Sequence, residues 1–427
     1  MTPNVSKNIK NANDKVVLGL IGCGGRGTSL ILDFQKNCQG VEVKYICDVD
    51  SSRGGRAIKE LGKSQGYEPL RVKDMRRVYE DKDVDAVVIA TPEHWHALAF
   101  IWACQAGKDI YIEKNISQSI PEGLKMVEAT QKYNRIVQVG TQNRSGDYAF
   151  SARDYISEGK LGNIVSVKCN CLLSGELAWS LKPDSPVPDG LDWDMWLGSA
   201  PKVPYNVSRH KAPYDWWEYS PGLQMAMAAH VVDLARMVLG DPDCPRSVYC
   251  AGGRILYDDN RDIPDMQAVT FEYDGFSMTC ESAKFGNYMS KSKPAVRFGD
   301  KFPDWRLSST RIEIYGTEGL MYLGIMGGGW QVIGQDGEVR DEEYGYFPDE
   351  NHQKNFIDSI RSGEKPNADI IQGHKSASLI HLANLSYRVG NKQLFYNSKG
   401  GIIENSKEAN LLSKGSYREP YTIPEKI

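Results

Sequence analysis

A glycine-rich stretch near the start of the chain, GLIGCGGRGTS at positions 19–29, constrains the fold most. Glycine is repeated there although each one costs roughly 0.5–1 kcal/mol relative to alanine in a regular element. An apolar, strand-like run precedes the stretch and a helix-like run follows it. Gly22, Gly24 and Gly27 have the spacing of a dinucleotide-binding turn, which provides a tight turn, a close approach of the pyrophosphate, and close packing of helix on strand.

An acidic residue follows this turn at the expected distance. Asp48 comes 21 residues after Gly27, at the end of the second predicted strand, VEVKYICDVD. An acid at that place binds the ribose hydroxyls of NAD, and its charge would repel the 2′-phosphate of NADP. We therefore expect NAD as the cofactor and NADP as the less suitable one, although Arg53 and Arg56 lie close enough to keep NADP open.

The hydrophobic pattern divides the chain into two kinds of fold. Strands and helices alternate over about 140 residues, which indicates an α/β Rossmann domain with a doubly wound, mostly parallel sheet. Longer strands joined by glycine-containing turns follow, including the hairpin signal FEYDGFSM, and predict an α+β domain with a large open, mostly antiparallel sheet. The expected segments are 1–15, disordered or a leader remnant; 16–141, the NAD-binding domain; 142–365, the substrate and oligomerisation domain; and 366–427, a C-terminal helix packing back toward the Rossmann domain, plus a tail.

Composition excludes some classes of partner. The chain has 427 residues, a net charge of −4 and 41% hydrophobic residues, so we expect no nucleic-acid partner. No apolar run reaches the roughly 18–20 residues that cross a bilayer, so we expect no membrane partner. Nine cysteines without a C-x-x-C pair predict buried thiols. The polar first fifteen residues are no signal peptide as written. They could be the remnant of a leader that was removed, so cytoplasm and periplasm are both alternatives for the location.

Two segments of the first domain carry candidate chemistry. IEKN places Glu113 and Lys114 at the C-terminal end of a strand, where open α/β sheets bind ligands. A partly desolvated lysine there can accept a proton, whereas a solvated lysine is the alternative. In ATPEHWHA, the loop with Thr91, Pro92 and His96 is expected to line the cofactor pocket. We favour this over a metal site, because no further ligands are recognisable.

The second domain adds a histidine and an aromatic segment. His230 and Asp233 share one face of the apolar helix MAMAAHVVDLARMVLG. A lone histidine in such a helix is more often a core residue, but the aspartate could hold its tautomer ready for proton transfer. Trp216 and Tyr219 lie in PYDWWEYSPG just before this helix. Their rings would either stack on a sugar or form a core or interface cluster.

Several stretches together resemble the glucose–fructose oxidoreductase / inositol dehydrogenase (Gfo/Idh/MocA) family. They are GLIGCGGRG, CDVD, DAVVIATPEHWHA, ACQAGKDIYIEKN, QVGTQNRS, LDWDMWLG, HVVDLARMVLG, IEIYGTEG and GHKSASLIHLANLSYRVG. The resemblance implies a Rossmann domain followed by an α/β domain with a large open sheet, which often forms an oligomer interface. It also implies NAD(P)-dependent oxidation or reduction of a sugar, cyclitol or related polyol, and a homo-oligomer, either dimer or tetramer, formed through the open sheet.

The family's functional residues carry over with two departures. Its E-K-P motif falls on Glu113, Lys114 and Asn115, so Lys114 takes the place of the catalytic lysine and Asn115 that of the proline. Its second-domain histidine maps to His230. The aspartate that many members carry four residues before this histidine is Ala226 here, so one carboxylate of the usual constellation is missing.

We therefore predict an NAD-dependent oxidoreductase acting on a hydroxyl or keto group of a sugar, glycoside or related polyol. Two other classes stay open, namely NAD-dependent, redox-assisted glycoside cleavage with recycling of the cofactor in place, and a cofactor-binding protein without turnover. The predicted catalytic residues are Lys114 and His230, and no metal is expected. The predicted cofactor contacts are Gly22, Gly24, Gly25, Arg26, Gly27, Asp48, Arg53, Thr91, Pro92, His96, Glu113 and Lys114. The predicted substrate contacts are Gln142, Arg144, Trp216, Tyr219 and Asp233.

Overall fold

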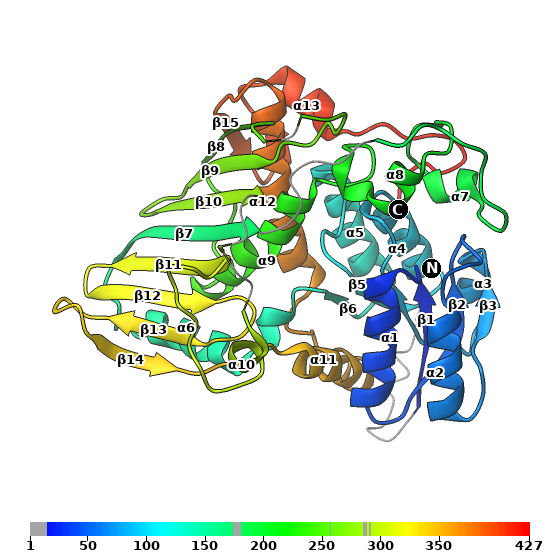
Figure 1. The fold of residues 1–427 in the computed structure, drawn as a ribbon, viewed down its shortest axis with the longest axis horizontal. Coiled ribbons are helices and arrows are strands. Elements are labelled where there is room, and N and C mark those ends of the chain that lie inside the picture. Colours follow the sequence, from blue (N-terminus) through cyan, green and yellow to red (C-terminus); the bar gives the residue numbers. More distant parts are fainter. Residues whose placement is uncertain (1–14, 174–180, 257, 285–287, 290–291) are drawn as a thin grey trace.

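The structure is a computed structural model that describes residues 15–173, 181–256, 258–284, 288–289 and 292–427. Of the predicted leader remnant, only Lys15 is among the described residues. Two β-sheets dominate the described chain, and Figure 1 shows them on opposite sides of the molecule, the N-terminal sheet in blue and cyan and the later one mainly in green and yellow. Helices pack on each sheet, so each has its own apolar core.

The first sheet has six parallel strands in the order β3-β2-β1-β4-β5-β6. They are β1 (Val16–Ile21), β2 (Val41–Cys47), β3 (Leu70–Val72), β4 (Ala86–Ile89), β5 (Asp109–Ile112) and β6 (Val137–Val139). The strand order reverses at β1 and β4, and ligands bind at such a switch point, outside the carboxyl ends of the strands. The predicted doubly wound sheet is confirmed.

Helices cover both faces of this sheet. Leu18 and Leu20 of β1 pack in one apolar cluster with α1, α2 and α11, whereas Ile21 packs in another with α3, α4 and α5. This division follows from the two-residue period of a strand, which sends successive side chains to opposite faces. The helices are α1 (Gly25–Asn37), α2 (Gly55–Gln65), α3 (Arg76–Glu80), α4 (His96–Gln105), α5 (Ile120–Tyr133) and α11 (Asp349–Ser362).

The second sheet has ten strands in the order β14-β13-β12-β11-β7-β10-β9-β8-β15-β16. Its pairs are antiparallel except for β7 with β10, so the predicted open, mostly antiparallel sheet is confirmed. The predicted hairpin joins β9 to β10, with Gly275 of its turn at a φ of +96°. The strands are β7 (Ile164–Leu173), β8 (Ser247–Gly253), β9 (Met266–Glu272), β10 (Ser277–Lys284), β11 (Thr310–Gly316), β12 (Gly319–Gly324), β13 (Trp330–Ile333), β14 (Val339–Glu343), β15 (Leu394–Asn397) and β16 (Ile402–Ile403).

Three helices lie against the second sheet: α6 (Asp147–Ser157), α9 (Leu223–Val238) and α12 (Ile370–Arg388). Helix α12 contacts α5 and β6 of the first domain as well as α9 and β8 of the second, and Figure 1 shows α9 and α12 between the two sheets. The other short elements are η1 (Glu93–Trp95), η2 (Gln142–Ser145), η3 (Pro213–Asp215), α7 (Trp193–Leu197), α8 (Val207–Lys211), α10 (Pro294–Arg297) and α13 (Lys407–Ser413).

The structure also bears on the expectations about the cysteines and about membrane-spanning helices. The nine cysteines carry free thiols and eight of them are buried, as predicted. Within the described part of the chain, no helix is both long enough and apolar enough to cross a membrane.

Candidate functional site

The glycine-rich turn between β1 and α1 has the geometry that its sequence predicts. Gly22 has a φ of +91°, which side-chain-bearing residues rarely adopt. A Cβ atom on Gly27 would lie 2.0 Å from the carbonyl oxygen of Gly22, so only glycine lets the helix start this close to the turn. These two glycines are required by the chain's own packing.

The two glycines between them are not required by packing. A Cβ atom on Gly24 would meet only the Arg53 Nη1, at 3.4 Å, and one on Gly25 would meet no atom within 4 Å. Helix α1 begins at Gly25 without a side-chain cap, so its first N–H groups stay available. Bare backbone at a helix N-terminus fits a pyrophosphate, which is the part of NAD expected here.

Asp48 stands at the end of β2, behind this turn. One carboxylate oxygen accepts the N–H of Cys23 at 2.7 Å and the other accepts the N–H of Asp50 at 2.9 Å. Burial raises the pKa of Asp48, whereas these two hydrogen bonds favour the ionised form. The carboxylate is thus oriented before any ligand binds.

A cavity of about 260 Å³ opens at this turn. Eight of the predicted cofactor contacts line it: Gly22, Gly24, Gly25, Arg26, Asp48, Arg53, Thr91 and Pro92. The wall also contains residues that sequence reasoning missed, namely Ile21, Cys47, Val49, Lys73, Met75, Ala90, Trp95, Trp196, His210, Lys211, Pro213 and Tyr214. The last five come from residues 196–214, after the first domain, and no local sequence signal indicates that this segment folds over the turn.

The other predicted cofactor contacts lie just behind the cavity wall. The Arg26 Nε donates to the Glu113 carboxylate at 2.8 Å, so Glu113 holds a residue of the wall. The buried His96 ring has one nitrogen 2.6 Å from the Asn115 carbonyl oxygen and the other 2.9 Å from that of Thr91. His96 therefore joins the loop after β4 to the loop after β5. Gly27 packs against the Gly22 carbonyl group and does not line the cavity.

Lys114 follows β5 directly. Its side chain is half-buried and lies outside the walls of both cavities described here. Its charge acts on Glu93 and on His96, which places it close to the loop after β4. The peptide bond between Lys114 and Asn115 is cis.

Glu93 is the most unusual residue of this region. It is only 2% exposed, and within the described ranges neither carboxylate oxygen has a hydrogen-bond partner. Burial raises its pKa to about 7, against the opposing influence of Lys114 and Ser220. The charge of Glu93 in turn raises the pKa of Tyr214, which lies in the cofactor cavity wall.

More polar atoms around Glu93 share this lack of a partner. Most buried polar groups in proteins are hydrogen-bonded, so a local group of exceptions calls for a ligand or water. Strands β4, β5 and β6 are neighbours, and their following loops meet at one edge of the sheet. Among the atoms without a partner in the described residues, those on the loops after these strands and on the aromatic segment are the Thr91 Oγ1, His94 Nδ1, Asn115 Nδ2, Thr141 Oγ1 and Trp216 Nε1.

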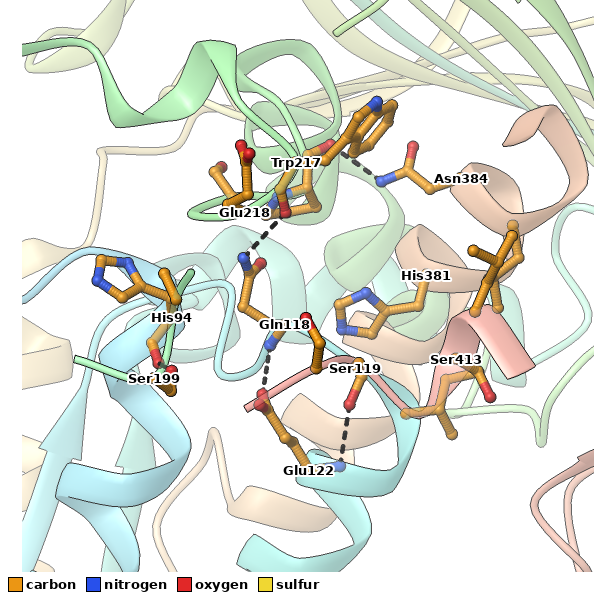
Figure 2. Close-up of a pocket in the computed structure, with 18 of the residues that line it drawn as sticks. His94, Gln118, Ser119, Glu122, Ser199, Trp217, Glu218, His381, Asn384 and Ser413 are labelled. Atoms are coloured by element: carbon orange, nitrogen blue, oxygen red, sulfur yellow. Dashed lines mark hydrogen bonds between the residues drawn. The ribbon is translucent and has the colours of Figure 1, made fainter. Parts of the chain in front are cut away.

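A second cavity, of about 310 Å³, has His94 of this group in its wall (Figure 2). The start of α5, the loop at 217–221, α12 and the C-terminal segment enclose it. Ser119 caps α5, and Glu122 accepts the N–H of Gln118 at 2.7 Å and the hydroxyl of Tyr417 at 2.9 Å. The wall of this second cavity consists of His94, Gln118, Ser119, Ile120, Glu122, Ser199, Ala200, Pro201, Trp217, Glu218, Ser220, Pro221, His381, Asn384, Leu385, Arg388, Leu411, Leu412, Ser413, Gly415, Ser416 and Tyr417.

The predicted substrate contacts lie elsewhere. The Arg144 Nε donates to the Asp233 carboxylate at 2.8 Å, both side chains are buried, and Ser376 also donates to Asp233, at 2.6 Å. Arg144 of η2 and Asp233 of α9 thus form a buried ion pair between these two elements. His230 itself is half-buried on α9.

The other three predicted substrate contacts are also absent from the two cavity walls. Gln142 is buried beside Tyr111 and Arg26. Tyr219 is fully buried against Trp196, with ring centroids 5.0 Å apart, and the Arg209 guanidinium lies 4.0 Å from the Trp216 ring centroid. Trp216 and Tyr219 thus lie in a packed aromatic cluster, which was the alternative to stacking on a sugar. The described residues contain no group of three or more side chains suited to hold a metal ion.

Comparison with known proteins adds three kinds of similarity. A model of an oxidoreductase family with an NAD-binding Rossmann fold matches residues 16–141, and a model of that family's C-terminal alpha/beta domain matches residues 159–284. A levoglucosan dehydrogenase of Pseudarthrobacter phenanthrenivorans is 30% identical over 198 residues, which are 46% of this chain and 43% of that protein. A glycosyl hydrolase family 109 protein of Shewanella sp. (strain W3-18-1) is 26% identical over 173 residues, 40% of this chain and 37% of that protein.

The matched regions thus span less than half the length of these two relatives. Among solved structures, the WlbA dehydrogenase from Bordetella pertussis, in complex with NADH and UDP-GlcNAcA, superposes with a TM-score of 0.64 at 18% identity. The superposition covers 90% of this chain and 99% of that one, which establishes the shared fold.

Proposed function

The chain belongs to the Gfo/Idh/MocA oxidoreductase family, and we propose that it is an NAD-dependent oxidoreductase acting on a hydroxyl or keto group of a sugar, glycoside or related polyol. One observation carries the proposal. A cavity that opens on the Gly22–Gly27 turn and Asp48 reaches a group of buried polar atoms that lack partners in the described chain, and the charge of Lys114 acts on Glu93 of this group. The first part fits a dinucleotide, and the second fits a polar molecule beside a base.

The residues present fit NAD at the turn. The free backbone at Gly24 and Gly25 would receive the pyrophosphate, and the preoriented Asp48 would accept hydrogen bonds from the adenosine ribose. When bound, NAD supplies the hydride acceptor. The protein's own part is to position the reacting carbon, to exclude water and to move the proton of the hydroxyl group.

Lys114 is the proposed proton acceptor. Oxidation of an alcohol breaks a C–H bond, whose electron pair leaves as hydride, and an O–H bond, whose proton goes to the Lys114 amine. Its place after β5, at the carboxyl edge of the parallel sheet, is where catalytic groups of such sheets lie. His230 of α9 is the proposed second proton-transfer residue.

The second cavity is the proposed place of the substrate. Its wall offers amide, hydroxyl, carboxylate and guanidinium groups together with an indole, which is the mixture that binds sugar hydroxyls and ring faces. Ser220 lies in its wall and interacts with Glu93, which in turn interacts with Lys114. Ser220 and Glu93 thus connect the wall of this cavity with Lys114.

Redox-assisted glycoside cleavage with recycling of NAD is the second candidate. The similarity to the Shewanella glycosyl hydrolase family 109 protein favours it. Transient oxidation of the sugar would acidify a neighbouring C–H, and elimination of the aglycone would follow before the hydride returns. This activity releases the aglycone without accumulating NADH, whereas a simple dehydrogenase accumulates NADH.

Self-association through the open sheet is the proposed assembly. Helices α6, α9 and α12 pack on this sheet, and strand positions such as Val165 of β7 and Tyr249 of β8 stay 56% and 41% exposed in the single chain. Light scattering of the purified protein should give a dimer or tetramer mass. A monomer at micromolar concentration would contradict this assembly.

The decisive experiment incubates the protein with NAD and a panel of sugars, polyols and glycosides. NADH absorbance and, separately, aglycone release are followed. Accumulating NADH supports the dehydrogenase, and aglycone release without NADH supports the cleaving enzyme. If NAD binds but the whole panel gives neither signal, the protein is a cofactor-binding protein without turnover.

A further inference from the structure

The missing carboxylate at position 226 leaves the proposed proton transfer without an acidic partner. Ala226 is fully buried on α9 and offers only a methyl group. A lysine that accepts a proton becomes an ammonium ion, and a partly buried cation is costly unless a negative charge lies nearby. The structure contains such a charge on a different element, at Glu93 of η1.

Glu93 stands between the two cavities. Its neighbours in the chain show this, because Pro92 lines the cofactor cavity and His94 lines the second one. The polar groups that face it come from three other segments: Lys114 and Glu113 after β5, Tyr214 of η3 and Ser220 before α9. His96 of α4 lies near the same two charged residues, Lys114 and Glu113.

The carboxyl group of Glu93 has no structural task in the described chain. Neither oxygen accepts a hydrogen bond of normal geometry there, although the side chain is almost completely buried and the Ser220 hydroxyl lies near enough to lower its pKa. Glu122 is the instructive contrast, since its equally buried carboxylate accepts two hydrogen bonds and holds the start of α5. A buried acid without such bonds lowers stability, so its presence points to a role in function.

We propose that Glu93 is the positioning carboxylate of Lys114, and that its negative charge replaces the one absent at Ala226 when Lys114 takes the substrate's hydroxyl proton. This rests on the proposed function, because it assigns the proton to Lys114. The hydroxyl proton moves to the Lys114 amine, and ionised Glu93 stabilises the resulting ammonium ion without itself touching the substrate. Ser220 assists, because its oxygen accepts the Gly222 N–H at 3.2 Å and its own proton can point to Glu93.

The protonation of Glu93 provides a test that needs no substrate. Infrared spectroscopy follows the carbonyl stretch of protonated buried carboxyl groups across pH. Because burial raises the pKa of both Glu93 and Glu122 to about 7, the wild type should show carboxyl groups that titrate near pH 7, one of which disappears in Glu93→Gln and another in Glu122→Gln. In the Lys114→Met variant the Glu93 signal should titrate at higher pH, since the Coulombic influence of Lys114 that lowers the pKa of Glu93 is removed.

Kinetics then test the role itself. The single-turnover rate of hydride transfer should rise with pH through about 7 as Glu93 ionises. Glu93→Gln should lower the rate about ten- to a hundredfold, the usual size of a lost charged interaction, and abolish this rise while NAD affinity stays unchanged. Glu93→Asp should restore part of the pH dependence. Asp262→Asn is the matched control, because burial raises the pKa of Asp262 to about 6, and its side chain accepts the Trp217 N–H at 3.2 Å without lining either cavity.

The outcomes separate this inference from the proposed function. If the wild type transfers hydride but Lys114→Met leaves the Glu93 titration unmoved, the two groups are not coupled and the inference is wrong. The same holds if Glu93→Gln keeps the pH dependence, or if Asp262→Asn removes it. If the wild type transfers no hydride from any sugar, the proposed function fails first, and the inference falls with it.

Discussion

The two ends of the cofactor site differ in whether their buried polar groups already have hydrogen-bond partners. At the turn end, formed by Gly22–Gly27 and Asp48, the Asp48 carboxylate already accepts two backbone N–H groups. At the Glu93 end, formed by Thr91–His94, Lys114 and Asn115, several buried polar atoms lack a partner among the described residues. The turn end is thus complete in the chain itself, whereas the Glu93 end is completed by what binds there.

The difference arises because local sequence determines the turn end, whereas long-range packing determines the Glu93 end. The turn end follows from local backbone requirements, such as the positive φ of Gly22 and the contact that forbids a Cβ atom on Gly27. The Glu93 end combines the loops after the neighbouring strands β4 and β5 with a segment more than a hundred residues later, which contains Tyr214. Each buried polar group left without a hydrogen bond costs about 1–3 kcal/mol, so ligand binding at this end should also stabilise the fold.

The largest effect is expected at the Glu93 end, from Lys114→Ala. Removal of a general base lowers a rate by about 10²–10⁴-fold, so single-turnover hydride transfer should fall within that range. NAD affinity should change little, because pyrophosphate and ribose are bound at the turn end. The measurement pairs rapid-mixing kinetics with calorimetric NAD binding. The exposed Lys82→Ala serves as the control, and near-normal hydride transfer by Lys114→Ala would remove Lys114 from the mechanism.

The next largest effect is expected at the turn end, from Gly27→Ala. The new Cβ atom would lie 2.0 Å from the Gly22 carbonyl oxygen, so the turn and α1 must move apart. Overpacking of this kind costs typically about 1–3 kcal/mol, and we expect the upper part of this range because the obstacle is backbone. Both the free energy of unfolding and NAD affinity should drop, as chemical denaturation and calorimetry would show.

Gly55→Ala at the start of α2 is the matched control for this prediction. A Cβ atom there would meet only the Arg71 Nη2, at 3.7 Å, so stability should hold or rise slightly. An unchanged free energy of unfolding in Gly27→Ala would mean that the turn is not packed as described.

A smaller effect is expected from Asp48→Ala, which tests cofactor choice. Loss of a charged hydrogen bond costs about 1.5 kcal/mol or somewhat more, so NAD affinity should fall roughly tenfold. NADP affinity should fall less or improve, because the charge that repels a 2′-phosphate is gone. Asp48→Asn separates the two causes, since it keeps an acceptor but loses the charge. A wild type that prefers NADP in calorimetry would contradict the assignment of Asp48.

The sequence predicts the turn end well because its signals are local. The glycine spacing and the acid after β2 each report a backbone or strand-end requirement, and eight of the predicted cofactor contacts do line one cavity. Their contact with NAD stays a prediction. Both sheets were predictable for the same reason, since alternation and turn residues act over a few positions.

The rest of the site depends on pairings that no local pattern reports. Arg144 and Asp233 are 89 positions apart, and their ion pair forms only once α9 lies against η2. Tyr214 reaches the cofactor cavity because the segment before α9 folds over the turn. Glu93 was visible in ATPEHWHA, but its importance follows from burial without a partner, which only the packed structure reveals.

The smallest effect is expected from Gly24→Ala, and it tests the comparison most directly. The chain leaves room for a Cβ atom here, with only the Arg53 Nη1 at 3.4 Å, so the free energy of unfolding should change by no more than about 0.5 kcal/mol. The same Cβ atom would push a bound pyrophosphate away from the backbone and weaken about one hydrogen bond. NAD affinity should therefore fall about two- to tenfold, corresponding to roughly 0.5–1.5 kcal/mol. Gly27→Ala loses both stability and affinity, whereas Gly24→Ala should lose affinity alone. If Gly24→Ala instead binds NAD as tightly as the wild type, the bare backbone at this position does not receive the pyrophosphate, and the cofactor must lie differently across the turn.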